Sequence, residues 1–155
     1  MADLDPGALG DELMSASAAL RRLVRAQLHD TLPGPRLRGA HVELMRVVQR
    51  QPGIGVAAAA KALYLAANSV STLVNQLTDE GLLLREVDPA DRRAVQLFLT
   101  EPAVARLEKW RRFRSELVGT GITRLAEDDR QAIADALPAL RTLIRWLDAE
   151  QDKRW

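Results

Sequence analysis

The side chains best suited to recognition chemistry are six amides and hydroxyls within residues 66–80, where apolar residues recur at helical spacing. At ~100° per residue, one helix face would carry Val70, Leu73, Val74 and Leu77, the pattern of a helix packed on a core. The opposite face would carry only uncharged polar side chains: Asn68, Ser69, Ser71, Thr72, Asn75 and Gln76. A solvated helix face usually carries Lys and Glu, whereas short groups that donate and accept hydrogen bonds suit the edges of DNA bases.

The residues after this helix predict a turn and a two-stranded hairpin. Gly81 stands where the end of a helix tolerates a positive φ. A strand is expected to begin at residues 82–84, and the alternation over residues 95–100 is typical of the returning strand. The charged tip between them contains the turn signal Asp88-Pro89. With a short helix expected over residues 56–63, the stretch predicts a winged helix-turn-helix.

The stretch from Leu63 to Thr100 resembles the MarR family of bacterial transcriptional regulators. The residues that carry the resemblance are Leu63, Val70, Leu77, Gly81-Leu82, Arg85, Asp88-Pro89-Ala90-Asp91-Arg92-Arg93 and Leu99-Thr100. The resemblance implies a mainly α fold with a small β-hairpin, in which a winged helix-turn-helix is joined to dimerisation helices. It implies a single domain over residues 1–155. Within it, residues 36–100 would form the DNA-binding lobe, and residues 10–32 and 101–155 the dimerisation helices.

The resemblance also assigns roles in DNA binding. Asp91 and Arg93 match a pair in which an arginine at the wing tip enters the minor groove and an acidic neighbour orients it, with Arg92 near phosphate. A surface turn held only by local ion pairs is the alternative reading of these residues. The remaining candidates for DNA contact are the six polar residues above together with Arg36, Arg38 and Arg85.

The predicted recognition helix departs from the family pattern. Relatives commonly carry Arg near Thr72 and Gln76, and this chain has none there. Asn and Gln favour adenine, which leaves an A/T-leaning half-site open. The missing arginine and the acidic residues around the wing support an alternative, a winged-helix dimer that binds a protein partner and has weak or lost DNA binding. A DNA titration separates the two.

Composition narrows the class of protein. The 155 residues are 47% apolar and only 4% aromatic, which favours a helical core of Leu, Val and Ala. There is no cysteine, which excludes a disulfide framework and a thiol-based redox switch. No apolar run approaches the ~20 residues of a membrane span, so a cytoplasmic protein is expected. The net charge is only +1, although residues 36–50 and 101–124 each carry an excess of three positive charges.

No catalytic or metal-binding arrangement stands out. His29 and His41 have no metal-ligand spacing beside them, and no Cys nucleophile or Gly-rich phosphate loop is present. We therefore expect neither an enzyme nor a cofactor. His41 lies where relatives line a pocket between the dimerisation helices and the DNA-binding lobe. It is a weak candidate for binding an anionic ligand, and a small aromatic or anionic effector is the expected partner besides DNA.

Further helices are expected on both sides of this lobe. The first residues to about Leu9 are expected to be unstructured, and a helix should follow to residue 30. Residues 39–50 should form a second helix, and Thr100 should cap another that runs to residue 124. The apolar face of a last helix from residue 127 predicts a homodimer. The alternative is that the terminal helices only complete a monomer core.

Overall fold

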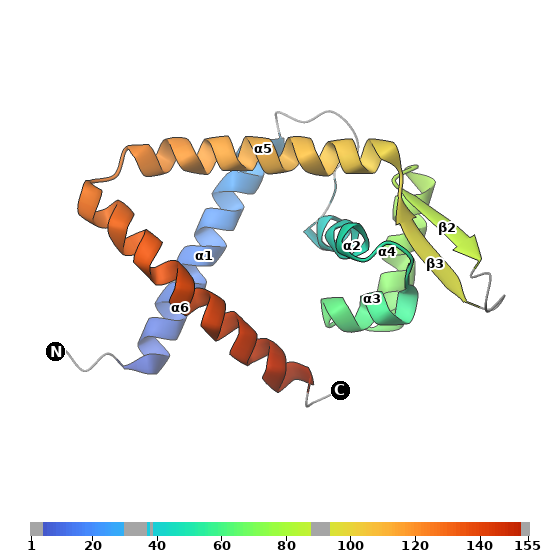
Figure 1. Cartoon of the computed structure of the whole chain (residues 1–155), viewed down its shortest axis with the longest axis horizontal. Helices are drawn as coiled ribbons and strands as arrows, with labels where there is room; N and C mark the ends of the chain where they lie inside the picture. The colour runs from blue at the N-terminus through green and yellow to red at the C-terminus, as the bar shows by residue number, and fades with distance from the viewer. Residues whose placement is uncertain (1–4, 30–36, 38, 88–93, 153–155) are drawn as a thin grey trace. The chain divides into compact units, whose positions relative to one another are not determined.

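The computed structural model describes residues 5–29, 37, 39–87 and 94–152. It is mainly helical with one small sheet, which confirms the predicted fold class (Figure 1). Residues Met1–Arg114 and Ser115–Trp155 form two compact units. The elements in chain order are α1 (Pro6–His29), α2 (Gly39–Arg50), β1 (Ile54–Gly55), α3 (Val56–Leu63), α4 (Ala67–Asp79), β2 (Leu83–Val87), β3 (Val95–Leu99), α5 (Glu101–Thr123) and α6 (Glu127–Asp152).

The core of the first unit lies between α2, α3, α4, the sheet and the first turns of α5. Its largest fully buried side chains are Leu44, Met45, Val48, Val70, Val74, Leu77, Leu83 and Leu97. These residues come from α2, α4, β2 and β3, and the three α4 residues among them belong to its predicted apolar face. The core therefore holds the apolar face of α4 and leaves the opposite face of this helix exposed to solvent.

The end of α4 is set by Gly81, whose φ of +68° lies in the left-handed region. The Gly81 N–H donates to the Thr78 carbonyl at 2.9 Å, and the Leu82 N–H donates to the Leu77 carbonyl at 2.8 Å. These two bonds form a Schellman motif, which satisfies carbonyls that a helix end otherwise leaves without partners. The prediction for Gly81 is confirmed, and the motif aims the chain directly into β2.

Thr100 links the end of α4 to the start of α5. Its Oγ1 donates to the Gly81 carbonyl at 2.8 Å and accepts the Ala103 N–H at 3.3 Å. The second bond is the predicted N-cap of α5. One hydroxyl therefore connects the turn after the predicted recognition helix to α5.

The sheet has three strands in the order β1-β3-β2, one more than the predicted hairpin. In β2 and β3 the register pairs Leu83 with Leu99 and Arg85 with Leu97. β1 pairs antiparallel with the other edge of β3, with Ile54 opposite Leu97. Two residues are too few to show strand alternation, so sequence periodicity could not reveal β1.

The expectation that the chain is unstructured to about Leu9 is wrong, because α1 begins at Pro6. The Asp5 carboxylate accepts the N–H groups of Gly7 and Ala8 at 3.3 and 3.1 Å. Asp at the N-cap and Pro in the first turn are both favourable at a helix start. Capping therefore starts the helix before its apolar periodicity becomes visible.

Within the described part of the chain, no helix combines the length and apolarity that crossing a bilayer requires.

Candidate nucleic-acid interface

The helix α4 presents the predicted polar face to solvent. Val70, Val74 and Leu77 are fully buried, and Leu73 packs partly against the same core. The six candidate residues on the other side are exposed except Ser71, which is half-buried. The bounds of α4 lie within one residue of the prediction, and its two faces divide as expected.

The turn between α3 and α4 positions this face. Ala59 and Ala60 are buried, and these small side chains let α3 pack closely on its neighbours. Tyr64 ends α3 with a φ of 53° and ψ of 40°, a left-handed conformation that is uncommon for a residue other than Gly. The Leu65 N–H donates to the Ala60 carbonyl at 3.0 Å, which closes the turn. The connection between α3 and α4 is therefore a short turn closed by a hydrogen bond.

The two hydroxyls of α4 already have partners for their protons. Ser71 Oγ donates to the Ala67 carbonyl at 2.9 Å, and Thr72 Oγ1 donates to the Asn68 carbonyl at 3.1 Å. A hydroxyl whose proton is engaged still offers its oxygen lone pairs. Ser71 and Thr72 are therefore arranged as acceptors, suited to the amino groups of adenine and cytosine.

The amides of α4 differ in their surroundings. The Asn68 Oδ1 accepts the Ser69 N–H at 2.8 Å. Asn75 is exposed and forms no hydrogen bond with another described residue. The Gln76 Oε1 lies 2.7 Å from the Nε2 of His41, whose residue is only 5% exposed. Both the oxygen and the NH₂ group of the Asn75 amide are therefore available, whereas the Gln76 oxygen is already engaged by the buried His41.

The other sequence candidates are placed as follows. Arg85 is exposed on β2, beside the hairpin strand β3. Arg36, Arg38, Asp91, Arg92 and Arg93 lie outside the described residues, so their roles stay predictions. His41 lies under α4 and is not among the residues that line the pocket described next.

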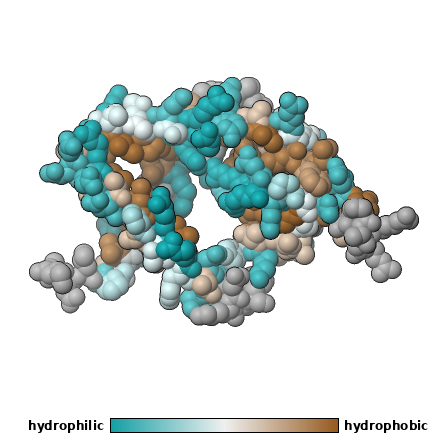
Figure 2. All heavy atoms as spheres, in the orientation of Figure 1, coloured by the Kyte–Doolittle hydropathy of each residue, from teal (hydrophilic) through white to brown (hydrophobic). Residues whose placement is uncertain are grey.

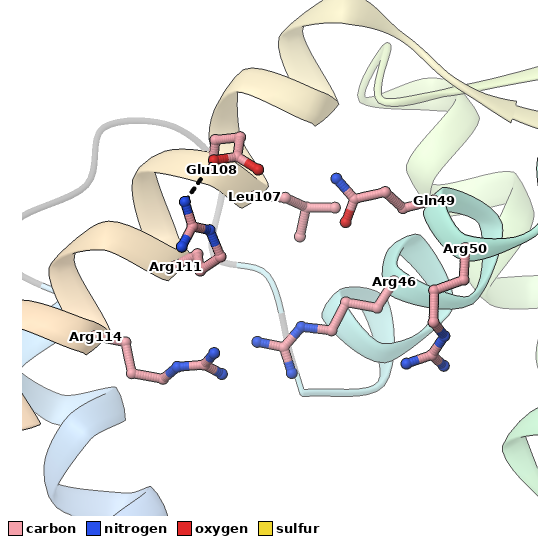
Figure 3. A pocket seen from close by; sticks show the side chains of 7 residues that line it. All are labelled: Arg46, Gln49, Arg50, Leu107, Glu108, Arg111 and Arg114. Atoms are coloured by element: carbon pink, nitrogen blue, oxygen red, sulfur yellow. Dashed lines mark hydrogen bonds and ion pairs between the residues drawn. The ribbon is translucent and has the colours of Figure 1, made fainter.

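A basic pocket of about 210 Å³ lies between α2 and α5 (Figure 3). Figure 3 shows Arg46 and Arg50 extending from α2, and Arg114 extending from α5 toward Arg46. The lining residues are Arg46, Gln49, Arg50, Leu107, Glu108, Arg111 and Arg114. Sequence reasoning did not single them out, although the two segments with excess positive charge contain all four arginines.

Two of the arginines are held by neighbours, and two are not. Arg46 pairs with Glu43 at 2.9 Å, and its guanidinium carbon lies 5.4 Å from the centre of the Trp110 ring. Arg111 pairs with Glu108 at 3.2 Å. Arg50 and Arg114 have no ion pair with another described residue. The pocket therefore carries positive charge that the described residues do not neutralise.

Comparison with known proteins identifies the family. The sequence profile of the MarR family matches residues 37–94. A transcriptional regulatory protein assigned to the hcr operon of Thauera aromatica is 32% identical over 117 residues, which are 70% of this chain and 68% of that protein. The chain belongs to the MarR family. This is a family of transcriptional regulators and not of enzymes, and the chain is a DNA-binding regulator of this class.

Solved structures share the fold across most of the chain. FabT of Streptococcus pneumoniae, solved in complex with DNA, superimposes with a TM-score of 0.72 at 21% identity, covering 92% of this chain and 99% of that one. BpsR of Bordetella bronchiseptica, whose DNA binding is regulated by 6-hydroxynicotinic acid, gives a TM-score of 0.59 at 22% identity, covering 84% and 98%. These likenesses confirm the winged helix-turn-helix fold.

Proposed function

We propose that this MarR-family regulator binds a near-palindromic operator as a homodimer and acts as a repressor that responds to a small ligand. The observation that carries the proposal is the exposed, uncharged polar face of α4, whose apolar side is fixed in the core. Such a helix followed by a hairpin matches the way helix-turn-helix proteins present a recognition helix to the major groove. DNA complexes of fold relatives such as FabT support the same reading.

The two halves of the interface have different roles in this proposal. Asn68, Ser71, Thr72, Asn75 and Gln76 face base edges and phosphates in the major groove. Arg92 and Arg93 lie at the flanking minor grooves, and Asp91 orients Arg93. A two-fold dimer places its recognition helices in successive major grooves, so the half-site centres are ~10 bp apart.

Selection from a randomised duplex library tests this proposal. We expect the protein to enrich a near-palindrome whose half-site centres are ~10 bp apart. The near-neutral chain should bind unrelated duplexes far more weakly, because nonspecific affinity comes from neutralised phosphates. Enrichment of no sequence, with no measurable binding to DNA, would instead support the alternative of a protein-interaction module.

The pocket between α2 and α5 supports the ligand response. Four arginines and one glutamate line it, and Leu107 is the only large apolar residue among the lining side chains. An aromatic ring would find little apolar surface there, whereas an anion would relieve the repulsion between the facing guanidinium groups of Arg46 and Arg114 (Figure 3). Guanidinium groups bind carboxylates and phosphates with paired hydrogen bonds. We infer that the effector is a small, multiply charged anion.

An anion in this pocket can act on DNA binding through helix spacing. The anion would contact both α2 and α5. The helix α2 packs on α4, and Thr100 connects the start of α5 to the turn at the end of α4. A ligand shifts an equilibrium only if it binds one state more tightly than the other. An anion that draws α2 and α5 together would therefore favour one placement of α4.

Pyrophosphate and a dicarboxylate such as malonate are expected to weaken operator binding at constant ionic strength, while benzoate has a smaller effect. Arg114→Ala should remove most of this response, because Arg114 has no carboxylate partner among the described residues and extends into the pocket. Arg112→Ala is the matched control, since Arg112 is an exposed arginine of α5 outside the pocket lining. Fluorescence anisotropy provides the measurement. Equal responses of the two variants would contradict the pocket assignment.

A further inference from the structure

His41 and Gln76 form a hydrogen bond that connects a buried side chain to the polar face of α4. Among the described residues, it is the only hydrogen bond of this kind. His41 lies in the first turn of α2, 35 residues before Gln76, and its Nε2 is 2.7 Å from the Gln76 Oε1. An amide oxygen can only accept a hydrogen bond. In the tautomer that carries its proton on Nε2, the His41 ring donates this hydrogen bond to the Gln76 oxygen.

This bond decides which end of the Gln76 amide faces outward. With Oε1 turned toward His41, the exposed end is the NH₂ group, which has no hydrogen-bond partner among the described residues. A free glutamine pairs with adenine by accepting from N6 and donating to N7 together. Gln76 cannot do so while its oxygen is turned toward His41, because the end of the amide that faces outward then presents only donors.

We propose that His41 is a positioning residue that sets the base preference of Gln76, an inference that rests on the proposed function. A donor-only group fits guanine best, since its major-groove edge carries two acceptors, N7 and O6. Thymine offers a single acceptor, O4, beside its methyl group, adenine places an amino donor beside its single acceptor, and cytosine presents only a donor. The base facing Gln76 is therefore guanine, which revises the A/T-leaning half-site that the amides alone left open.

If His41 had only a structural role, the hydrogen bond to Gln76 would satisfy its buried ring and would have no effect on base choice. Buried polar groups are nearly always hydrogen-bonded, so the existence of the bond does not separate the two roles. The difference lies in sequence preference. If Gln76 reads a base, release of its amide changes which base is chosen at one position of each half-site and leaves the other positions unchanged.

The test is selection from a randomised duplex library with four proteins, followed by affinities for operators that differ only at the selected position. The wild type should prefer guanine over adenine there by roughly fivefold, the lower end of discrimination by base contacts. His41→Phe keeps a ring but removes the donor, and should bring guanine and adenine within about twofold of each other. Gln76→Glu should shift the preference toward cytosine, because a carboxylate accepts from its N4 amino group.

The double variant His41→Phe with Gln76→Lys provides the rescue. Lysine is donor-only in every orientation, so guanine preference should return without His41. Thermal unfolding by circular dichroism checks that each protein is folded. If His41→Phe does not fold, the wild type and Gln76→Glu still decide, since Gln76 is an exposed side chain. A held amide gives a guanine preference in the wild type that Gln76→Glu shifts toward cytosine, whereas a free amide gives an adenine preference.

Three results overturn the inference. One is His41→Phe with the same base preferences as the wild type at every position. Another is a set of Gln76 variants whose preferences equal the wild type's, which would mean that Gln76 reads no base although the protein reads DNA. The third is a wild type that enriches no sequence, and this alone would also overturn the proposed function.

Discussion

Replacing Ile144 and Leu147 in α6 by glutamate is expected to split the protein into monomers and to lower its affinity for the operator by roughly 100-fold or more. Ile144 is 64% exposed and Leu147 is 53% exposed in the single chain. They share a face of α6 with Ile133 and Leu137, which are also more than two-fifths exposed. Such a stripe marks an interaction surface, because monomeric proteins rarely leave contiguous apolar patches open.

The same feature recurs in α1. Large apolar side chains there are more than half exposed: Leu9, Met14, Leu20 and Leu23. Figure 2 shows apolar side chains interrupting the hydrophilic surface on the face in view. The family resemblance implies that both helices lie in the dimer interface, and this assignment stays a prediction. Charged residues in that interface would be buried without partners, at a cost of several kcal/mol each.

The loss of affinity follows from the loss of bivalent binding. A dimer that has engaged one half-site holds its second recognition helix near the other at an effective concentration of the order of millimolar. A monomer has only a single half-site contact. Light scattering measures the mass, and anisotropy measures binding to the full operator.

Thr142→Glu is the matched control for this pair. Thr142 is an exposed residue on the opposite side of α6, and its Oγ1 accepts from Arg145 at 2.9 Å, so a glutamate there gains a cationic neighbour. It should remain dimeric with wild-type affinity. A dimer formed by the Ile144 and Leu147 double variant would show that α6 does not carry the interface.

Asn75→Ala is expected to weaken binding to the preferred operator by about 1–3 kcal/mol per half-site and to blur the preference at one position. The Asn75 amide is exposed and has both ends available, so its removal deletes a base contact without disturbing the core. Binding to unrelated duplexes should change little, because that binding depends on phosphates.

Arg93→Ala is expected to fail in a different way. The proposed wing arginine contributes charge and groove insertion, so its loss should weaken binding to many sequences alike. The slope of log affinity against log salt should fall by about 0.9 per subunit. Arg130→Ala provides the comparison, because Arg130 is an arginine of α6 paired with Glu127 at 3.6 Å. An Arg93→Ala protein with wild-type affinity and salt slope would show that the wing does not insert.

Local patterns in the sequence were sufficient for the helices α2, α3 and α4. The bounds of α2 and α3 match the prediction, because Pro52 and Gly53 interrupt the chain between two strongly periodic segments. Gly81 and Thr100 were predictable for the same reason. A left-handed turn and a helix cap depend on residues only a few positions apart, so their chemistry is visible in a short stretch of sequence.

Features that depend on distant residues were decided only by the tertiary structure. The strand β1 exists because β3, more than 40 residues later, offers a free edge. The arginine pocket forms where α2 meets α5, and neither helix alone indicates it. His41 was a weak candidate for binding an anionic ligand, which stays a prediction, and only the packing of α2 on α4 reveals that its ring lies beside Gln76.

The polar face of α4 shows this division most clearly. Helical periodicity alone determined that Asn75 and Gln76 would both point away from the core. It could not distinguish the two amides, because a residue's type specifies which hydrogen bonds it can form and not which of them are already occupied. Only the fold brings His41 under Gln76 and leaves Asn75 open, and this contact across 35 residues makes two chemically similar side chains differ in the hydrogen bonds that they can still form.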